Sequence, residues 1–156
     1  MEEPIGIAVL GVLHDPFKKS LMQWISRRKA LRLCPASQAQ LGVLSPALRR
    51  SPAVRLPADA AVVFCSECDP AAAYAARGEL LPLDIGLSHR DTLTLTSRKD
   101  SSAVIALQRP LITLHSTLLE PMEWPVALQG NFSPELLLSA AAVALLTELP
   151  FSVFPD

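Results

Sequence analysis

A phosphate-binding loop is nearly formed between an apolar run at residues 5–12 and a helix expected over residues 17–28. A working loop has the pattern Gly-x4-Gly-Lys-Ser/Thr, in which bare backbone N–H groups surround a phosphate and the lysine reaches it. The positions that still resemble this pattern form the degenerate phosphate loop: Gly11, Lys18, Lys19 and Ser20. However, Pro16 stands where the second glycine belongs, and proline has no N–H and a bulky ring. The residues therefore argue against nucleotide hydrolysis, although the architecture indicates a nucleotide-binding ancestor.

A second polar group follows in an apolar stretch that prolines stiffen at positions 110, 121 and 125. Its members are Gln108, Arg109, Glu120 and Glu123. If the arginine and the glutamates converge, they can bind a zwitterion, form an ion pair between subunits or act as an acid–base pair. The alternative is a surface salt bridge flanked by turn residues, which contributes little to stability. The sequence leaves both interpretations open.

Cys65 and Cys68 form a Cys-x-x-Cys pair between an expected strand and an expected helix, the position of a thioredoxin-like redox pair. A helix N-terminus favours the thiolate that such chemistry needs. The neighbouring Glu67 and Asp69 disfavour it, because a carboxylate repels a second negative charge. A thiol redox function is therefore the weaker alternative, and buried cysteines without chemistry are preferred. The three cysteines and three scattered histidines show no metal-ligand spacing, so no metal and no cofactor are expected.

The charges are unevenly distributed along the chain, although the net charge is only −1. Nine of the fourteen basic residues lie in the segment 18–55, and no Asp or Glu occurs between Asp15 and Asp59. They are Lys18, Lys19, Arg27, Arg28, Lys29, Arg32, Arg49, Arg50 and Arg55. This basic segment can meet an acidic partner, a nucleic acid or an anionic membrane, but a solvated helix face with loops is the preferred interpretation. A nucleic acid is disfavoured, because only Trp24 interleaves with these charges and base stacking needs aromatic side chains.

Length and composition fit a single globular domain over residues 1–156, because half of the residues are hydrophobic and only 19% are charged. Three cysteines, an odd number, do not predict a disulfide framework. The longest nearly apolar run, residues 136–146, is shorter than the roughly 20 residues that span a bilayer. The N-terminus lacks the basic stretch and apolar core of a signal peptide. We therefore expect no membrane span and a cytoplasmic location.

Short apolar runs and helix-cap signals predict the elements that position these groups. The strands expected first are 5–12, 60–65 and 81–87, with one or two further strands and irregular links over residues 30–58, where the apolar pieces are 30–34 and 41–44. The expected helices cover residues 17–28, 69–77 and 133–149. Each opens at an Asp-Pro or Ser-Pro pair, in which the Asp or Ser is the expected N-cap. From residue 92 the pattern changes, with further strands expected at 92–96, 103–108, 111–115 and 126–128. The expected fold class is α/β, with a mostly parallel sheet flanked by helices and a small antiparallel sheet.

Three short stretches resemble the central, ATP-binding domain of the Mur ligase family. They are Ala61-Val-Val-Phe, the helix start Asp69-Pro-Ala-Ala-Ala and the turn Leu83-Asp-Ile-Gly-Leu-Ser88. The closing segment, with Gly130 and Asn131 before an alanine-rich helix, is similar to the end of that domain. Residues 5–28 and 59–150 carry the resemblance. It implies a Mur-ligase-central-domain-like fold and places Asn131 near a nucleotide base.

Two departures separate this chain from the activity of that family. The phosphate loop is lost at Pro16, and residues 34–58, where the family holds magnesium with Glu and His, contain neither residue. Phosphoryl transfer depends on phosphate positioning, a metal and a cationic clamp. ATP-dependent ligase activity is therefore not expected.

The first hypothesis is a non-catalytic, Mur-ligase-like relic domain, a pseudoenzyme that acts as a binding or interaction module. Its partner is expected to be another protein or a second copy of the chain in a homo-oligomer, because few charges favour self-association. The alternative is a small-molecule enzyme that uses the ancestral cleft. Arg109 would then anchor the ligand, and Glu120 or Glu123 would be the acid–base group.

Overall fold

The computed structural model describes residues 3–128, 133–150 and 153–154 of the chain. The chain divides into two compact units, Met1–Leu83 (unit 1) and Asp84–Asp156 (unit 2). Strand β5 (Leu81–Ile85) crosses the boundary between them. The single domain expected from the length of the chain stays a prediction.

Unit 1 is built on a parallel sheet of short, mostly buried apolar strands. They are β1 (Ile5–Leu10), β2 (Leu31–Leu33), β3 (Leu41–Leu44), β4 (Ala61–Cys65) and the first residues of β5, in the order β5-β4-β3-β1-β2. β1 pairs in parallel with β2 and with β3, and β3 pairs in parallel with β4. Apolar runs without alternation are typical of such strands, because both of their faces are covered. The order places a topological switch point between β1 and β3, where the direction of the connections reverses.

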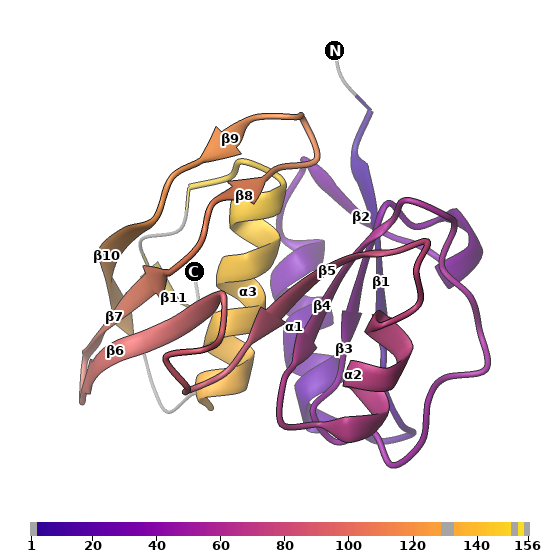
Figure 1. Ribbon diagram of the computed structural model, residues 1–156, viewed down its shortest axis with the longest axis horizontal. Helices are drawn as coiled ribbons and strands as arrows, with labels where there is room; N and C mark the ends of the chain where they lie inside the picture. The colour runs from indigo at the N-terminus through magenta and orange to yellow at the C-terminus, as the bar shows by residue number, and fades with distance from the viewer. Residues whose placement is uncertain (1–2, 129–132, 151–152, 155–156) are drawn as a thin grey trace. The chain divides into compact units, whose positions relative to one another are not determined.

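The helices of unit 1, α1 (Pro16–Ser26) and α2 (Asp69–Ala75), lie on opposite sides of these strands (Figure 1). Right-handed connections that progress in opposite directions along a sheet cover opposite faces. The predicted start of α1 is confirmed, with Asp15 as its N-cap. In α2 the expected cap is wrong, because Asp69 is already helical and Cys68 stands at the N-cap without a side-chain bond.

Unit 2 is mainly antiparallel. Its main strands are β6 (Leu93–Lys99), β7 (Ser102–Leu107), β10 (Met122–Leu128) and β11 (Val153–Phe154). β6 pairs with β7, and β7 with β10, in antiparallel register, while the end of β5 pairs in parallel with β6. The helix α3 (Pro134–Leu146) contacts β6 and is buried at most of its positions, in agreement with its apolar composition.

A separate two-stranded sheet pairs β8 (Leu111–Ile112) with β9 (Leu118–Leu119) in antiparallel register. The strand expected over residues 111–115 therefore ends early. Its end follows from Thr113, whose hydroxyl accepts the backbone N–H of Thr117 at 3.1 Å and so closes a turn.

The described residues thus form an α/β protein with a mostly parallel sheet, a small antiparallel two-stranded sheet and three α-helices. At this level the fold class expected from the sequence is confirmed. The strand expected at 126–128 is longer than predicted, because β10 begins at Met122. Among the described residues, no helix has the length and the apolar character that crossing a bilayer requires.

Candidate functional site

The loop after β1 ends in a carboxylate that caps α1. Oδ1 of Asp15 accepts the backbone N–H of Phe17 at 3.1 Å, and the Asp15 carbonyl accepts the N–H of Lys19 at 3.1 Å. Pro16, at the start of the helix, has no N–H to donate. Asp15 is only 6% exposed, and its Oδ2 has no hydrogen-bond partner among the described residues. A fixed carboxylate therefore stands at the helix N-terminus, where a phosphate loop would hold its anion.

Gly11 keeps its place in the degenerate phosphate loop, but the space beside it is filled. A Cβ built on Gly11 would lie 2.6 Å from Oδ2 of Asp15 and 3.4 Å from Cβ of Lys18. Because Gly11 has no side chain, the Asp15 carboxylate and the aliphatic part of the Lys18 side chain can lie beside it. Lys19 and Ser20 lie exposed on α1.

A cleft opens beside this loop, at the carboxyl ends of β1 and β3; we call it the switch-point cleft. Its volume is about 580 Å³, within the range of small-molecule sites. One wall is formed by the loop after β1 and the start of α1, and the other by residues 48–54, which follow β3. The lining includes Gly11, Val12, Lys18, Arg49, Arg50 and Val54. Doubly wound sheets bind ligands at such a switch point, outside the carboxyl ends of their strands.

The lining of the switch-point cleft is positively charged. Lys18, Arg49 and Arg50 line it, and none of its described lining residues is acidic. In the described part of the chain, none of these three cations forms an ion pair. Cations that line the same concave cleft focus a positive potential, so the cleft attracts anions. Not every basic residue of the segment 18–55 lines the cleft. The Arg28 guanidinium, for example, stacks 4.0 Å above the centre of the Trp24 ring.

Hydrogen bonds to α2 hold the wall that carries the two arginines. The hydroxyl of Tyr74 donates to the carbonyl of Val54 at 2.9 Å and accepts the N–H of Leu56 at 3.1 Å. The hydroxyl of Ser51 donates to the carbonyl of Pro70 at 3.1 Å. These bonds order the wall before any ligand arrives, which lowers the entropic cost of binding.

Packing fixes the same segment against the sheet. Leu56 is buried against Gly42 of β3, where an added Cβ would lie 2.5 Å from Cδ1 of Leu56. The backbone N–H of Ser45 donates to the carbonyl of Leu10 at 2.8 Å and so joins the ends of β3 and β1. A glycine inside a strand often marks such a close approach.

Cys65 and Cys68 are buried thiols outside any disulfide bond, at the end of β4 and at the start of α2. The thiol of Cys68 donates to the carbonyl of Leu48 at 3.6 Å and to that of Ser45 at 3.9 Å. These two contacts join the start of α2 to the segment that follows β3. The arrangement therefore supports a structural role for Cys68, which connects α2 to the wall of the cleft.

A second cavity, of about 770 Å³, adjoins the same loop. Val12 and Lys18 line both cavities, while Leu13, Lys19 and Met22 line the second one. Three members of the degenerate phosphate loop therefore line one or both of these cavities: Gly11, Lys18 and Lys19.

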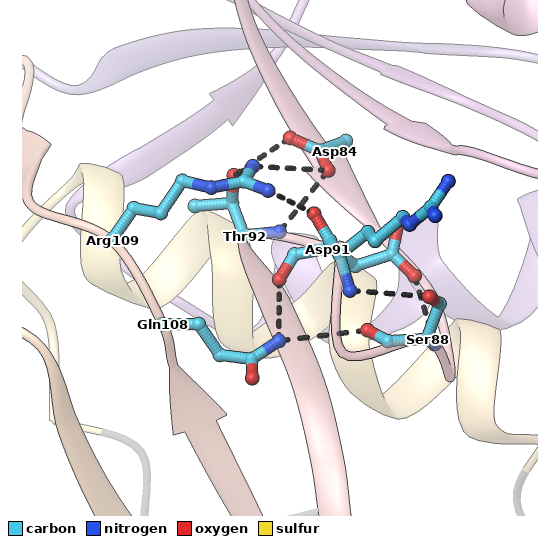
Figure 2. Close-up of polar contacts among 7 residues, drawn as sticks. Asp84, Ser88, Asp91, Thr92, Gln108 and Arg109 are labelled. Carbon is cyan, nitrogen blue, oxygen red and sulfur yellow. Dashed lines mark hydrogen bonds and ion pairs between the residues drawn. The ribbon is translucent and has the colours of Figure 1, made fainter.

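Unit 2 brings Arg109 to Asp84 rather than to a glutamate (Figure 2). One guanidinium nitrogen lies 3.8 Å from Oδ2 of Asp84 and donates to Oγ1 of Thr92 at 3.0 Å, and the other donates to the carbonyl of Arg90. Asp84 also accepts the hydroxyl of Thr92 at 2.7 Å and its N–H at 3.1 Å. Because Arg109 is 53% exposed, solvent screens its ion pair, and the hydrogen bonds define its position.

Gln108 holds the same loop, residues 86–92, through a second set of bonds (Figure 2). Its amide nitrogen donates to the carbonyl of Asp91 at 2.6 Å, and the Asp91 carboxylate accepts the N–H of Ser88 at 3.0 Å. Gln108 and Arg109, just after β7, therefore shape the connection between β5 and β6.

The other predicted site residues lie apart from this cluster. Glu120 and Glu123 are exposed, and in the described part of the chain no hydrogen bond or ion pair joins either of them to Arg109. Glu123 lies on β10, opposite Ala106 of β7. Asn131 lies outside the described residues.

Sequence reasoning missed the residues that shape the switch-point cleft, above all Tyr74, Leu56 and Gly42. Their contacts join segments that are distant in the chain. One signal was nevertheless present, because the pair Arg49-Arg50 follows an apolar strand inside a long segment without acidic residues.

The chain matches no protein-family model, and a comparison with curated protein sequences finds no match. Function must therefore be inferred from the chemistry of the cleft.

Proposed function

We propose that this chain is a non-catalytic binding module that holds an anionic ligand in the switch-point cleft. The observation that carries this proposal is the set of three cations, Lys18, Arg49 and Arg50, which line one cleft whose described lining residues include no Asp or Glu. The position of the cleft at the β1/β3 switch point supports ligand binding, and its concave form favours a small anion over a flat protein surface.

Phosphoryl transfer is not part of the proposed function. The N-terminus of α1 is capped by Asp15 and begins with Pro16, so the backbone donors that should surround a phosphate are reduced. Residues 16–58 contain no Asp, Glu or His that could hold magnesium beside the cleft. The proposal includes descent from a domain like the central domain of Mur ligases. In this view the ancestral nucleotide site has lost its catalytic residues, and the cleft has remained.

The alternative enzyme, with Arg109 as ligand anchor, has less support. The donors of Arg109 are engaged with Asp84, Thr92 and the backbone of Arg90, and no glutamate completes an acid–base pair with it among the described residues. Self-association and binding of an acidic protein partner through the segment 18–55 stay predictions from composition and charge.

A thermal-shift titration tests the proposed function, because a ligand that binds only the folded state raises the Tm by mass action. Inorganic pyrophosphate and citrate are expected to raise the Tm saturably, and less so at high ionic strength, where solvent ions screen the cations. ATP is expected to behave like pyrophosphate with or without magnesium, and to remain unhydrolysed. A shift that requires both ATP and magnesium, with release of phosphate, would overturn the non-catalytic assignment.

Charge-matched variants locate the site. Arg50→Gln is expected to weaken the pyrophosphate shift at least fivefold in apparent affinity. Lys29→Gln removes the same charge just before β2, at the amino ends of the parallel strands and away from their carboxyl ends, where the cleft lies, and is expected to leave the shift unchanged. If no anion stabilises the wild-type protein, or if both variants behave alike, the cleft is not the binding site.

A further inference from the structure

Aliphatic side chains share the switch-point cleft with the three cations. Val12 is 41% exposed and Val54 is 51% exposed, and they come from the two opposite walls. Single exposed aliphatic residues are common on protein surfaces, but two that line one cavity give it an apolar part beside its charged part. Leu48 and Pro52 extend this lining along the wall that follows β3.

The combination of cations and aliphatic side chains argues against two classes of anion as the preferred ligand, inorganic phosphate and nucleotides. Inorganic phosphate would satisfy the cations but would leave the valine side chains in water. A nucleotide would need a stacking surface for its base, and none of the described lining residues is aromatic. An anion with a flexible aliphatic chain satisfies both parts of the lining at once.

We infer that the ligand of the switch-point cleft is an amphipathic anion, with a carboxylate or phosphate head and a single aliphatic chain. This inference rests on the proposed function, because it names the chemical class of the anion bound there. The head lies on Lys18, Arg49 and Arg50, where the guanidinium groups can donate in pairs to its oxygens. The chain lies between Val12 and Val54. The concave form of the site, with a volume of about 580 Å³, favours a free single-chain molecule over a bilayer surface.

The wall that follows β3 has an ordered conformation, and this supports selective binding of amphipathic anions. The carbonyl of Val54 is held by the hydroxyl of Tyr74, so Val54 has an ordered position in the lining of the cleft. An exposed valine at an ordered position offers apolar contact without a further loss of chain entropy. Each methylene that enters such a contact is expected to raise the affinity roughly two- to fourfold.

Isothermal titration calorimetry with a homologous series tests the inference. The probes are inorganic phosphate, butyl phosphate and hexyl phosphate below their aggregation concentrations, with hexanol as the uncharged control. The affinity is expected to increase along the series, and hexanol is expected not to bind detectably. Arg50→Gln is expected to weaken hexyl phosphate at least fivefold. Val54→Ser is expected to remove most of the gain from butyl to hexyl phosphate while inorganic phosphate binds as before.

A matched control separates the chain contact from general surface hydrophobicity. Leu81→Ser replaces another exposed aliphatic residue of unit 1, which is 57% exposed and does not line the cleft, and is expected to keep the full gain. The Tm of each variant reports whether it is folded. If all phosphates bind equally and Arg50→Gln abolishes binding, the amphipathic inference is wrong and the proposed function stands. If no anion binds, both are wrong.

Vesicles distinguish a free amphiphile from a membrane lipid. Phosphatidylcholine vesicles with and without phosphatidylglycerol are compared by co-sedimentation. Binding to the anionic vesicles without binding to hexyl phosphate would overturn the inference in favour of a membrane surface. Binding to hexyl phosphate alone supports it.

Discussion

The hydroxyl of Tyr74 donates to the carbonyl of Val54 at 2.9 Å, and this bond connects α2 to the wall of a basic cleft. The same hydroxyl accepts the N–H of Leu56 at 3.1 Å, so one oxygen orders two backbone positions of the segment. Tyr74 is fully buried, and its position in the chain gives no indication that it supports a ligand site.

Tyr74→Phe removes this hydroxyl and keeps the ring. The variant is expected to be less stable by about 1–3 kcal/mol, because the N–H of Leu56 loses its buried partner. Urea denaturation measures the change. Pyrophosphate binding is expected to weaken as well, since the wall that carries Arg49 and Arg50 is less ordered. Ser26→Ala, which deletes an exposed hydroxyl of α1, is the control and is expected to change neither quantity. Unchanged stability of Tyr74→Phe would show that the bond does not order the wall.

Asp15 combines a cap with a charge, and two variants separate these roles. Asp15→Ala is expected to lower the stability by about 0.5–2 kcal/mol, because the N–H of Phe17 loses its acceptor. Asp15→Ser keeps a capping oxygen and is expected to stay close to the wild-type stability. It also removes a negative charge next to Lys18, so pyrophosphate affinity is expected to rise. Calorimetry checks this, and a loss of affinity in Asp15→Ser would contradict the electrostatic account.

The parts of the fold that sequence reasoning predicted depend on local signals. The start of α1 is an example, because an N-cap carboxylate and the N–H that it accepts are two residues apart. The buried strands β3 and β4 were also predicted from a local signal, because each is a short run of apolar residues. The end of the strand at Ile112 was missed, since it depends on the turn that Thr113 closes rather than on apolar character.

The candidate site was harder to predict, because its contacts cross strands. Arg109 was grouped with Glu120 and Glu123, which follow it closely in the chain. In the structure its partners are Asp84 and Thr92, which the pairing of β5, β6 and β7 brings beside it. The order of charges along the chain does not reveal the register of the strands, and this register determines which charged residues form an ion pair.

Arg109→Gln distinguishes a residue that shapes a loop from one that anchors a ligand. Because the side chain is half exposed, the loss of stability is expected to be modest, about 0.5–1.5 kcal/mol, and to come mainly from the hydrogen bonds to Thr92 and the Arg90 carbonyl. Hydrogen exchange at residues 86–92 is expected to become faster, and pyrophosphate binding is expected to stay unchanged. Loss of pyrophosphate binding with full stability would instead favour the enzyme hypothesis, in which Arg109 anchors the ligand.

The contact between Gly42 and Leu56 offers a test of how the wall is seated on the sheet. Gly42→Ala places a Cβ 2.5 Å from Cδ1 of Leu56, so this buried leucine must move, at an expected cost of about 1–3 kcal/mol. Leu56→Ala alone is expected to cost about 2–5 kcal/mol, because it leaves a cavity. In the double variant the new methyl group enters that cavity, so the combined loss is expected to be smaller than the sum of the two single losses. Chemical denaturation of all four proteins gives the coupling. Additive losses would mean that Gly42 and Leu56 are not in direct contact, and that the segment carrying Arg49 and Arg50 is held to the sheet by its hydrogen bonds alone.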